Sequence, residues 1–174
     1  YQACELCPRR CKARRASGHA GFCGMTSELR VARSALHFWE EPPISGEAGS
    51  GAIFFSGCPL RCVFCQNHEI SGEGFGLPVT RSRLSEMMLE LEAQGALNIN
   101  LVTALHYAPD VRQAVFDARA AGLTLPIVCN TSGYENAEVV RAMADVVDVW
   151  LPDFKYADPA LAGSLSAAPD YPDV

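Results

Sequence analysis

The sequence predicts an α/β fold in which parallel strands alternate with helices, preceded by a small cysteine-rich head. From residue 52 onward, short apolar runs alternate with segments whose apolar residues recur at helical spacing. Four such strand–helix units follow one another, and this order requires parallel strands joined by right-handed crossovers. The 174 residues, 49% hydrophobic and 20% charged, are enough for one domain with its own core.

The elements of this body can be placed in order along the chain. Pro109 and Gly122 flank the second helix, Gly95 is placed to end the first, and Met87 and Met88 fall on its core-facing side. Folds of this kind carry their chemistry at the carboxyl ends of the strands. We expect strands at 52–56, 98–103, 125–129 and 146–151, and helices at 82–91, 110–121, 135–145 and 159–165.

Composition divides the chain into three parts. Residues 1–33 form a head rich in turn formers, residues 34–50 a connector with Pro42-Pro43 and several glycines, and residues 51–174 the α/β body. Seven of the 14 basic but only two of the 20 acidic residues lie in the head, which therefore carries +5 and the remainder −11. The acidic body argues against a nucleic-acid partner. No apolar run approaches the ~20 residues that span a bilayer, and no secretory leader is evident, so we expect a cytoplasmic protein without a membrane partner.

The eight cysteines form two groups and a singleton. Disulfides are possible in principle, but the tight spacing in a chain expected to be intracellular favours metal ligation. Cys129 lies in an apolar run and is expected to be a buried small hydrophobe. The groups are Cys4, Cys7, Cys11 and Cys23 in the head, and Cys58, Cys62 and Cys65 after the first strand.

The second group has the spacing C-x3-C-x2-C. Three thiolates on one loop can hold three corners of a [4Fe–4S] cluster and leave the fourth iron open to another ligand. A structural zinc ion would need a fourth ligand, which His68 could supply, and this alternative stays open.

The head group has the spacing C-x2-C-x3-C-x11-C in a stretch without a core of its own. Four thiols suit a closed site whose metal, zinc or a second iron–sulfur cluster, supplies folding energy. The nearby basic residues would lower the pKa values of the thiols, or would simply form a solvated surface. They are Arg9, Arg10, Lys12, Arg14 and Arg15.

With Phe64 directly before its last cysteine, the Cys58-x3-Cys62-x2-Cys65 motif resembles the signature of the radical SAM superfamily. Residues 51–71, 98–103, 130–134 and 151–156, with the head, resemble its pyruvate formate-lyase-activating-enzyme-like branch. The resemblance implies a partial (β/α)6 barrel in which a [4Fe–4S] cluster binds S-adenosylmethionine (SAM) and cleaves it reductively to a 5′-deoxyadenosyl radical. That radical abstracts hydrogen from a substrate. The implied partners are SAM, an electron donor such as flavodoxin or ferredoxin, and a glycyl-radical protein.

The same resemblance assigns roles to residues at the strand ends. Phe64 would meet the adenine, and Lys155, with Asp153 as a polar neighbour, would pair with the SAM carboxylate. The Gly-Gly-Glu of the activases is missing after the second strand, where Thr103 or a backbone carbonyl would substitute. Asn130-Thr131 stands where the activases have Asp-Thr, which puts any bound monovalent cation in doubt.

Alternatives stay open for these residues and for the function. Asp153 and Lys155 could be a solvated pair, residues 130–133 a turn and helix cap, and His106-Tyr107 a packed pair rather than a group at the working rim. The protein could instead act on a small molecule or a peptide, or be a structural metal-binding module or fragment. Because four units are fewer than six, we expect the native polypeptide to continue beyond Val174.

Overall fold

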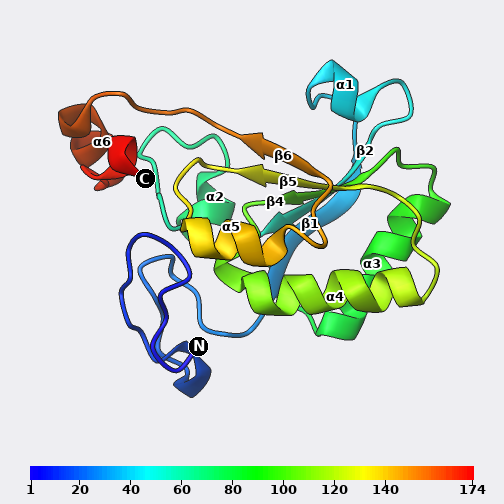
Figure 1. Ribbon diagram of the computed structural model, residues 1–174, viewed down its shortest axis with the longest axis horizontal. Coiled ribbons are helices and arrows are strands. Elements are labelled where there is room, and N and C mark those ends of the chain that lie inside the picture. Colours follow the sequence, from blue (N-terminus) through cyan, green and yellow to red (C-terminus); the bar gives the residue numbers. More distant parts are fainter.

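The computed structural model describes residues 1–174 and is built on a six-stranded mixed sheet (Figure 1). Its strand order is β3-β1-β2-β4-β5-β6. The α/β prediction is confirmed, and the four predicted strands are all present and parallel. They are β2 (Ser50–Phe55), β4 (Ile99–Val102), β5 (Ile127–Thr131) and β6 (Val149–Pro152).

Register aligns the ends of these strands. Phe54 lies beside Val102, Val102 beside Asn130, and Asn130 beside Leu151. Because parallel strands share one direction, the residues that follow them leave the sheet at a single edge. β5 starts at Ile127 rather than at residue 125. β6 starts at Val149 rather than at residue 146, because Val146 and Val147 pack into the core from the loop before it.

Two strands were not predicted. β1 (Arg30–His37) pairs antiparallel with the whole of β2, and β3 (Leu77–Pro78) adds a two-residue antiparallel edge. β1 runs across the boundary placed at residue 33, so the segment expected as a connector begins as part of the sheet. The all-parallel sheet implied by the sequence is therefore corrected to a mixed one. The sequence of β1 does not alternate strictly between polar and apolar residues, and this pattern hid it.

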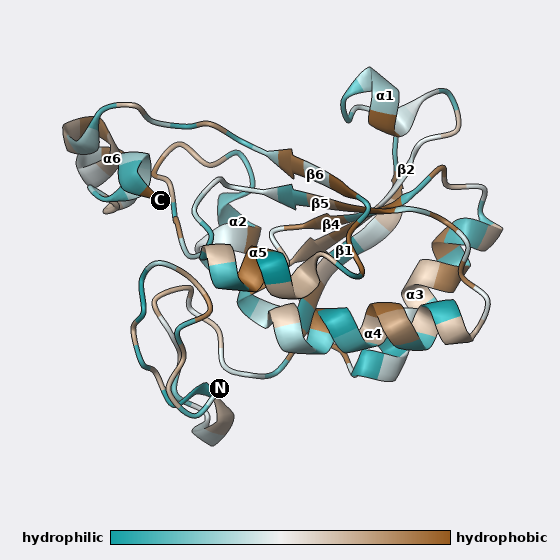
Figure 2. Ribbon diagram, in the orientation of Figure 1, coloured by the Kyte–Doolittle hydropathy of each residue, from teal (hydrophilic) through white to brown (hydrophobic).

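Helices cover one face of the sheet (Figure 1): α3 (Arg81–Ala93), α4 (Ala108–Ala120) and α5 (Ala137–Met143). Thr80 caps α3 by accepting a hydrogen bond from the Arg83 backbone N–H. Met88 and Cys129 are fully buried and Met87 partly so, as predicted. Figure 2 shows apolar residues along the strands and mixed polarity along the helices.

The remaining elements lie mainly around the strand ends. The head and α6 (Pro159–Ser166) both lie on the side toward which β4, β5 and β6 point (Figure 1). There a second apolar cluster joins α6 to the loop after β2 through Leu60, Tyr134, Tyr156 and Tyr171. The short elements are α1 (Pro42–Ser45), α2 (His68–Ser71) and the 3-10 turns Arg15–Ser17, Leu105–Tyr107 and Tyr171–Asp173.

None of the helices combines the length and the apolar character that crossing a bilayer would require.

His106 is a packed core residue, which confirms that alternative. It is 3% exposed, its ring lies 4.2 Å from that of Tyr107, and its Nε2 lies 2.9 Å from the Ser56 carbonyl oxygen. Because a carbonyl only accepts, Nε2 carries the proton, and the buried Nδ1 has no hydrogen-bond partner. Burial, with the charge of Arg15, lowers the pKa of His106 to about 3, against the opposing effect of the Ser56 hydrogen bond.

Gly133 allows two strand-end loops to meet. Its φ is +75°, and a side chain there would overlap the Asp153 carbonyl oxygen and lie 2.5 Å from the Tyr171 hydroxyl. Gly95 has a similar φ of +90° but nothing within 4 Å of an added Cβ. Gly133 thus carries both a backbone and a packing requirement, whereas Gly95 carries only the first.

The two glycines make a matched pair for mutagenesis. Gly95→Ala is expected to cost ~1 kcal/mol of unfolding free energy from the left-handed backbone alone. Gly133→Ala should cost a further ~1–3 kcal/mol because of the overlap. Chemical denaturation of both variants measures the difference, and equal losses would contradict the proposed close approach.

His106 should make stability fall on acidification. The unfolded state binds a proton below the ordinary pKa of about 6.5, whereas the folded state does not until about pH 3. The native protein should therefore lose ~2 kcal/mol more than His106→Gln between pH 7.5 and pH 5. Urea unfolding of both proteins at the two pH values checks this, and parallel losses would show that His106 does not titrate as expected.

Candidate functional site

The three-cysteine loop turns sharply out of β2. Gly57 and Arg61 both have left-handed backbones, with φ of +81° and +53°. A side chain at Gly57 would overlap Met25 and lie 2.7 Å from the Cys23 carbonyl oxygen, so the loop packs directly on the head. Cys58, Cys62 and Cys65 are half-buried as a result.

Hydrogen-bond donors point at two of the sulfur atoms. The Leu60 backbone N–H donates to Cys58 Sγ at 3.4 Å, and the Ser71 hydroxyl donates to Cys65 Sγ at 3.3 Å. Burial raises the pKa of Cys58 to about 11, and the nearby Cys62 and Cys65 add to the rise while backbone N–H groups oppose it. The three thiols thus lie close enough to influence one another.

These thiols suit a group larger than one ion. His68, the fourth ligand that a zinc site would need, pairs instead with Glu73 at 3.6 Å and is largely exposed. The donor set of three thiolates with N–H and O–H donors fits an iron–sulfur cluster better than zinc.

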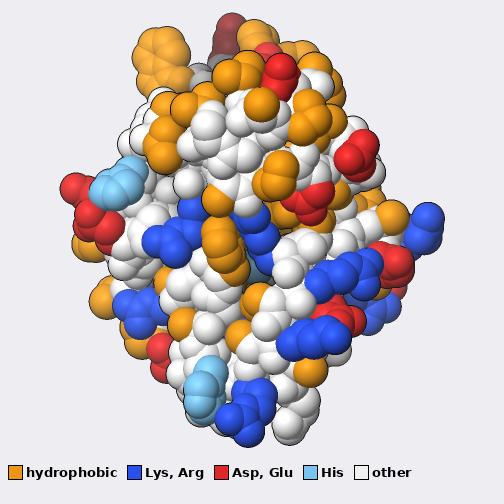
Figure 3. Space-filling model, turned by 90° about the vertical axis from the view of Figure 1, so that its left-hand side faces the viewer, with side chains coloured by type: hydrophobic (Ala, Val, Ile, Leu, Met, Phe, Trp, Pro, Cys, Tyr) orange, Lys and Arg blue, Asp and Glu red, His pale blue; other side chains and the backbone are white.

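A cavity of about 690 Å³ adjoins these cysteines at the carboxyl ends of the strands. Figure 3 views the molecule from this side and shows basic side chains gathered across its middle, with hydrophobic ones above them. The cavity brings together every residue expected to hold the cluster or SAM. These are Cys58, Cys62, Phe64, Cys65, Thr103, Asn130, Thr131, Asp153 and Lys155.

Lys155 and Asp153 are paired within this cavity. The Lys155 Nζ lies 2.5 Å from Asp153 Oδ2, and the lysine side chain is 26% exposed. Burial lowers the pKa of Lys155, but the hydrogen bond and charge of Asp153, with Cys62, outweigh it and raise the pKa overall. Tyr171 fixes this loop, because its hydroxyl accepts from the Lys155 backbone N–H at 3.0 Å and donates to the Ser132 carbonyl at 2.9 Å.

Two residues of the cavity have unusual features: Phe64 has an exposed aromatic ring, and Thr103 has a left-handed backbone. Phe64 is 57% exposed, with its ring edge-on to Tyr156 at 6.3 Å. Thr103 has a φ of +56°, which is rare for a β-branched residue, and its N–H is held by the Asn130 carbonyl at 3.0 Å. Such strain tends to persist at functional sites.

Residues 130–133 do not cap a helix: Asn130 and Thr131 end β5, and the chain bends at Gly133. The Gly133 N–H bonds to the Thr131 hydroxyl at 3.4 Å, whereas α5 begins only at Ala137. The helix-cap alternative was therefore wrong. Asn130 instead directs its amide to the Glu40 carboxylate at 3.1 Å.

Glu40 belongs to a polar group that the sequence analysis missed. Its Oε2 also accepts from Asn100 Nδ2 at 2.8 Å, and Arg33 and His37 line the same cavity from β1. Asn100 is completely buried in β4, and its Oδ1 has no partner. A polar residue inside an apolar strand was the one signal in the sequence that could have revealed this group.

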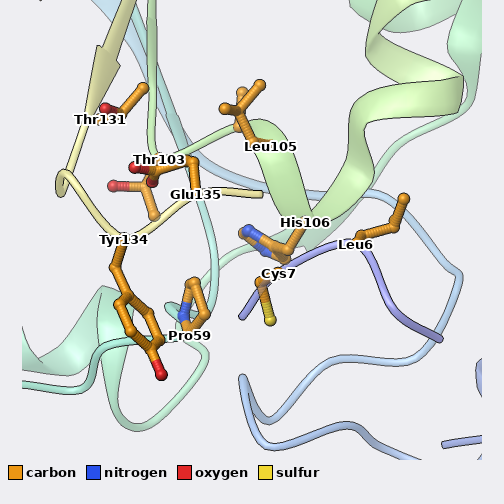
Figure 4. A pocket seen from close by; sticks show the side chains of 10 residues that line it. Leu6, Cys7, Pro59, Thr103, Leu105, His106, Thr131, Tyr134 and Glu135 are labelled. Atoms are coloured by element: carbon orange, nitrogen blue, oxygen red, sulfur yellow. The ribbon is translucent and has the colours of Figure 1, made fainter. Parts of the chain in front are cut away.

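The head cysteines lie against the same loop. Cys4 and Cys23 are buried, Cys7 is half-buried and Cys11 is exposed. Cys7 lines a small second cavity with Pro59 and His106 (Figure 4). Burial raises the pKa of Cys7 to about 11 and also raises that of Cys23, where the charge of Arg15 acts in the expected, lowering direction but is outweighed.

Comparison with known proteins identifies the family to which the chain belongs. The chain is 28% identical over 181 residues to an uncharacterized protein of Methanocaldococcus jannaschii, covering 100% of the chain and 52% of the relative. It therefore spans about half the length of that relative. No solved structure matches. The family model described as "4Fe-4S single cluster domain" matches residues 44–163, which include all three cysteines of the loop. With most of its length matched, the chain belongs to this 4Fe-4S cluster-binding family of radical SAM type.

Proposed function

We propose that the protein is a radical SAM enzyme that holds a [4Fe–4S] cluster on Cys58, Cys62 and Cys65 and binds SAM in the adjoining cavity. One observation carries the proposal: the three thiols and all six residues expected to contact SAM line a single cavity. The cluster, when bound, would supply the electron for reductive cleavage of SAM. Every other task falls to the residues of the chain.

The loop residues prepare the thiols for the cluster. Leu60 and Ser71 donate hydrogen bonds to Cys58 and Cys65, which favours the thiolate form that ligation requires. Because burial keeps the pKa of Cys58 high without metal, loading the cluster releases a proton there. Val63 is 73% exposed beside Cys62, so the loop is accessible to an electron donor such as flavodoxin or ferredoxin.

The strand-end residues suit the polar groups of SAM. Lys155 presents an ammonium group to the cavity for the carboxylate, and Asp153 is placed to hold that ammonium when SAM is absent. The Phe64 ring offers an exposed face to the adenine. Thr103 stands where the activases carry Gly-Gly-Glu, and it lines the cavity with a left-handed backbone.

Two substrate classes fit this site. Activation of a glycyl-radical protein rests on the resemblance to the activases. The polar side chains of Arg33, His37 and Glu40, which line the cavity, favour a second candidate, a small molecule or peptide with hydrogen-bonding groups. All eight cysteines are free thiols, which suits a reducing, cytoplasmic compartment.

Loss of one cluster ligand should abolish SAM cleavage. Anaerobically reconstituted and reduced protein is expected to form 5′-deoxyadenosine from SAM, and Cys62→Ala should form none, because the cluster loses a ligand. Cys129→Ala is the matched control, since that thiol is buried in β5 away from the cavity. Chromatography of the nucleoside products measures the outcome.

Two results would contradict the enzyme assignment. Formation of 5′-deoxyadenosine by Cys62→Ala would remove the cluster from the mechanism. A colourless protein that contains zinc but no iron after anaerobic purification would favour a structural metal-binding module.

Lys155 should govern SAM affinity. Lys155→Met removes a charge-assisted hydrogen bond worth ~1.5–3 kcal/mol, so the Kd for SAM should rise about 10–100-fold. Arg112→Met is a suitable control, because its partner Asp145 lies outside the cavity. Equilibrium dialysis of the reconstituted protein with labelled SAM measures the Kd of both variants. An unchanged Kd in Lys155→Met would show that the Lys155–Asp153 pair takes no part in SAM binding.

A further inference from the structure

The head cysteines occupy one folded patch rather than a loose tail. The Lys12 N–H donates to the Cys4 carbonyl at 2.9 Å, and the Cys4 N–H donates to the Ala13 carbonyl at 3.1 Å. Arg10 and Lys12, on either side of Cys11, have left-handed backbones with φ of 38° and 53°. Neither is glycine, so this turn needs support from the structure around it.

The four thiols lie near one another within this patch. A side chain at Gly21 would lie 3.4 Å from Cys11 Sγ and 3.5 Å from Cys23 Sγ, so these two sulfur atoms border the same point. The Arg10 backbone N–H donates to the Cys7 carbonyl at 3.0 Å, so Cys7 lies at the start of the turn that carries Cys11. The four sulfur atoms do not converge on one point in this structure. Binding of one ion would therefore require the exposed Cys11 side chain to move toward the other three.

The buried guanidinium of Arg15 is an independent indication that a negative charge belongs beside the head cysteines. Arg15 is 1% exposed, and its guanidinium donates to the carbonyls of Thr26 at 2.7 Å and His106 at 2.6 Å. No carboxylate pairs with it. Carbonyls satisfy its hydrogen bonds but do not neutralise its charge, and an unpaired buried cation is costly.

The rings of Tyr1 and Tyr107 face the guanidinium at 4.7 and 5.2 Å, and burial raises the pKa of both hydroxyls, so sulfur is the neighbouring group that can become an anion. The Arg15 Nη1 lies 3.6 Å from Cys4 Sγ, and the Arg15 side chain borders the same point at Gly21 as the Cys23 sulfur. As neutral thiols, Cys4 and Cys23 would leave the cation unbalanced. As ligands of a divalent ion, four thiolates leave a net negative site that the guanidinium complements.

We propose that Cys4, Cys7, Cys11 and Cys23 bind one zinc ion, and that Arg15 is its buried counter-charge. Four thiolates close a tetrahedral shell and leave no open position, which is typical of structural zinc. Binding displaces the thiol protons, and the ion would join the segment of Cys4, Cys7 and Cys11 to the one that carries Cys23. This site is separate from the cluster loop and does not depend on the function proposed above.

A zinc ion in the head would also stabilise the neighbouring cluster loop. Arg15 donates to the His106 carbonyl, and the His106 ring in turn bonds to the carbonyl of Ser56, just before the cluster loop. Arg9 donates to the Pro59 carbonyl at 2.9 Å and to the Ser166 carbonyl at 2.7 Å. The zinc-bound head would therefore brace the cluster loop and the end of α6.

Metal analysis of the full chain without its cluster ligands tests the site. The triple variant Cys58→Ala, Cys62→Ala, Cys65→Ala is expected to retain one zinc ion per chain. Adding Cys11→Ser, the exposed ligand and so the mildest change to the fold, should abolish zinc binding. Adding Cys129→Ala instead should leave it intact.

Three results would overturn the proposal: no zinc in the triple variant, equal zinc in the Cys11→Ser and Cys129→Ala backgrounds, or iron with sulfide in place of zinc. Failure of SAM cleavage by the unmodified protein would count against the proposed function alone.

Substitution of Arg15 tests the counter-charge. Arg15→Met should weaken zinc binding about 10–100-fold in competition with a chromogenic chelator. Arg15→Lys keeps the charge and should lose less, and Arg14→Met, an exposed neighbour, should match the parent. Circular dichroism shows whether each variant is folded. Equal affinities for Arg15→Met and Arg14→Met would overturn this role.

Discussion

The in-register pairing of four parallel strands is the constraint on which the rest of this structure depends. Each strand of β2, β4, β5 and β6 ends beside the next, so four loops of unrelated sequence leave the sheet at one edge. Thiols from the first loop, a threonine from the second, an Asn-Thr pair from the third and a lysine from the fourth therefore meet. Backbone hydrogen bonds between the strands therefore place these residues at one edge, independently of contacts between their side chains.

Three segments far apart in sequence then hold this edge in place. The head packs against Gly57, Arg9 reaches both the cluster loop and the end of α6, and Tyr171 ties the loops after β5 and β6 together. Hydrogen bonds to backbone carbonyls here add to the apolar contacts of Leu60, Tyr134, Tyr156 and Tyr171 and of Met25 in the head. The head is therefore part of the structure around the cavity.

The body of the fold was predictable because its signals are local. The helical spacing behind α3 and α4 and the apolar runs of β2 and β4 are visible within a few residues. β1 was missed because its pairing with β2 depends on backbone groups and its side chains face both a core and a polar cavity. Missing β1 also hid Arg33, His37 and Glu40, whereas the motif-bearing residues were found because they directly follow strands.

The left-handed backbone of Thr103 has a consequence for protein engineering. Glycine or asparagine would adopt that conformation with less strain, so this position offers an obvious stabilising replacement. Yet the same residue borders the cavity, and relaxing it would free the segment between β4 and the 3-10 turn at Leu105–Tyr107. A substitution of Thr103 that raises thermal stability is therefore expected to lower the activity proposed for this site.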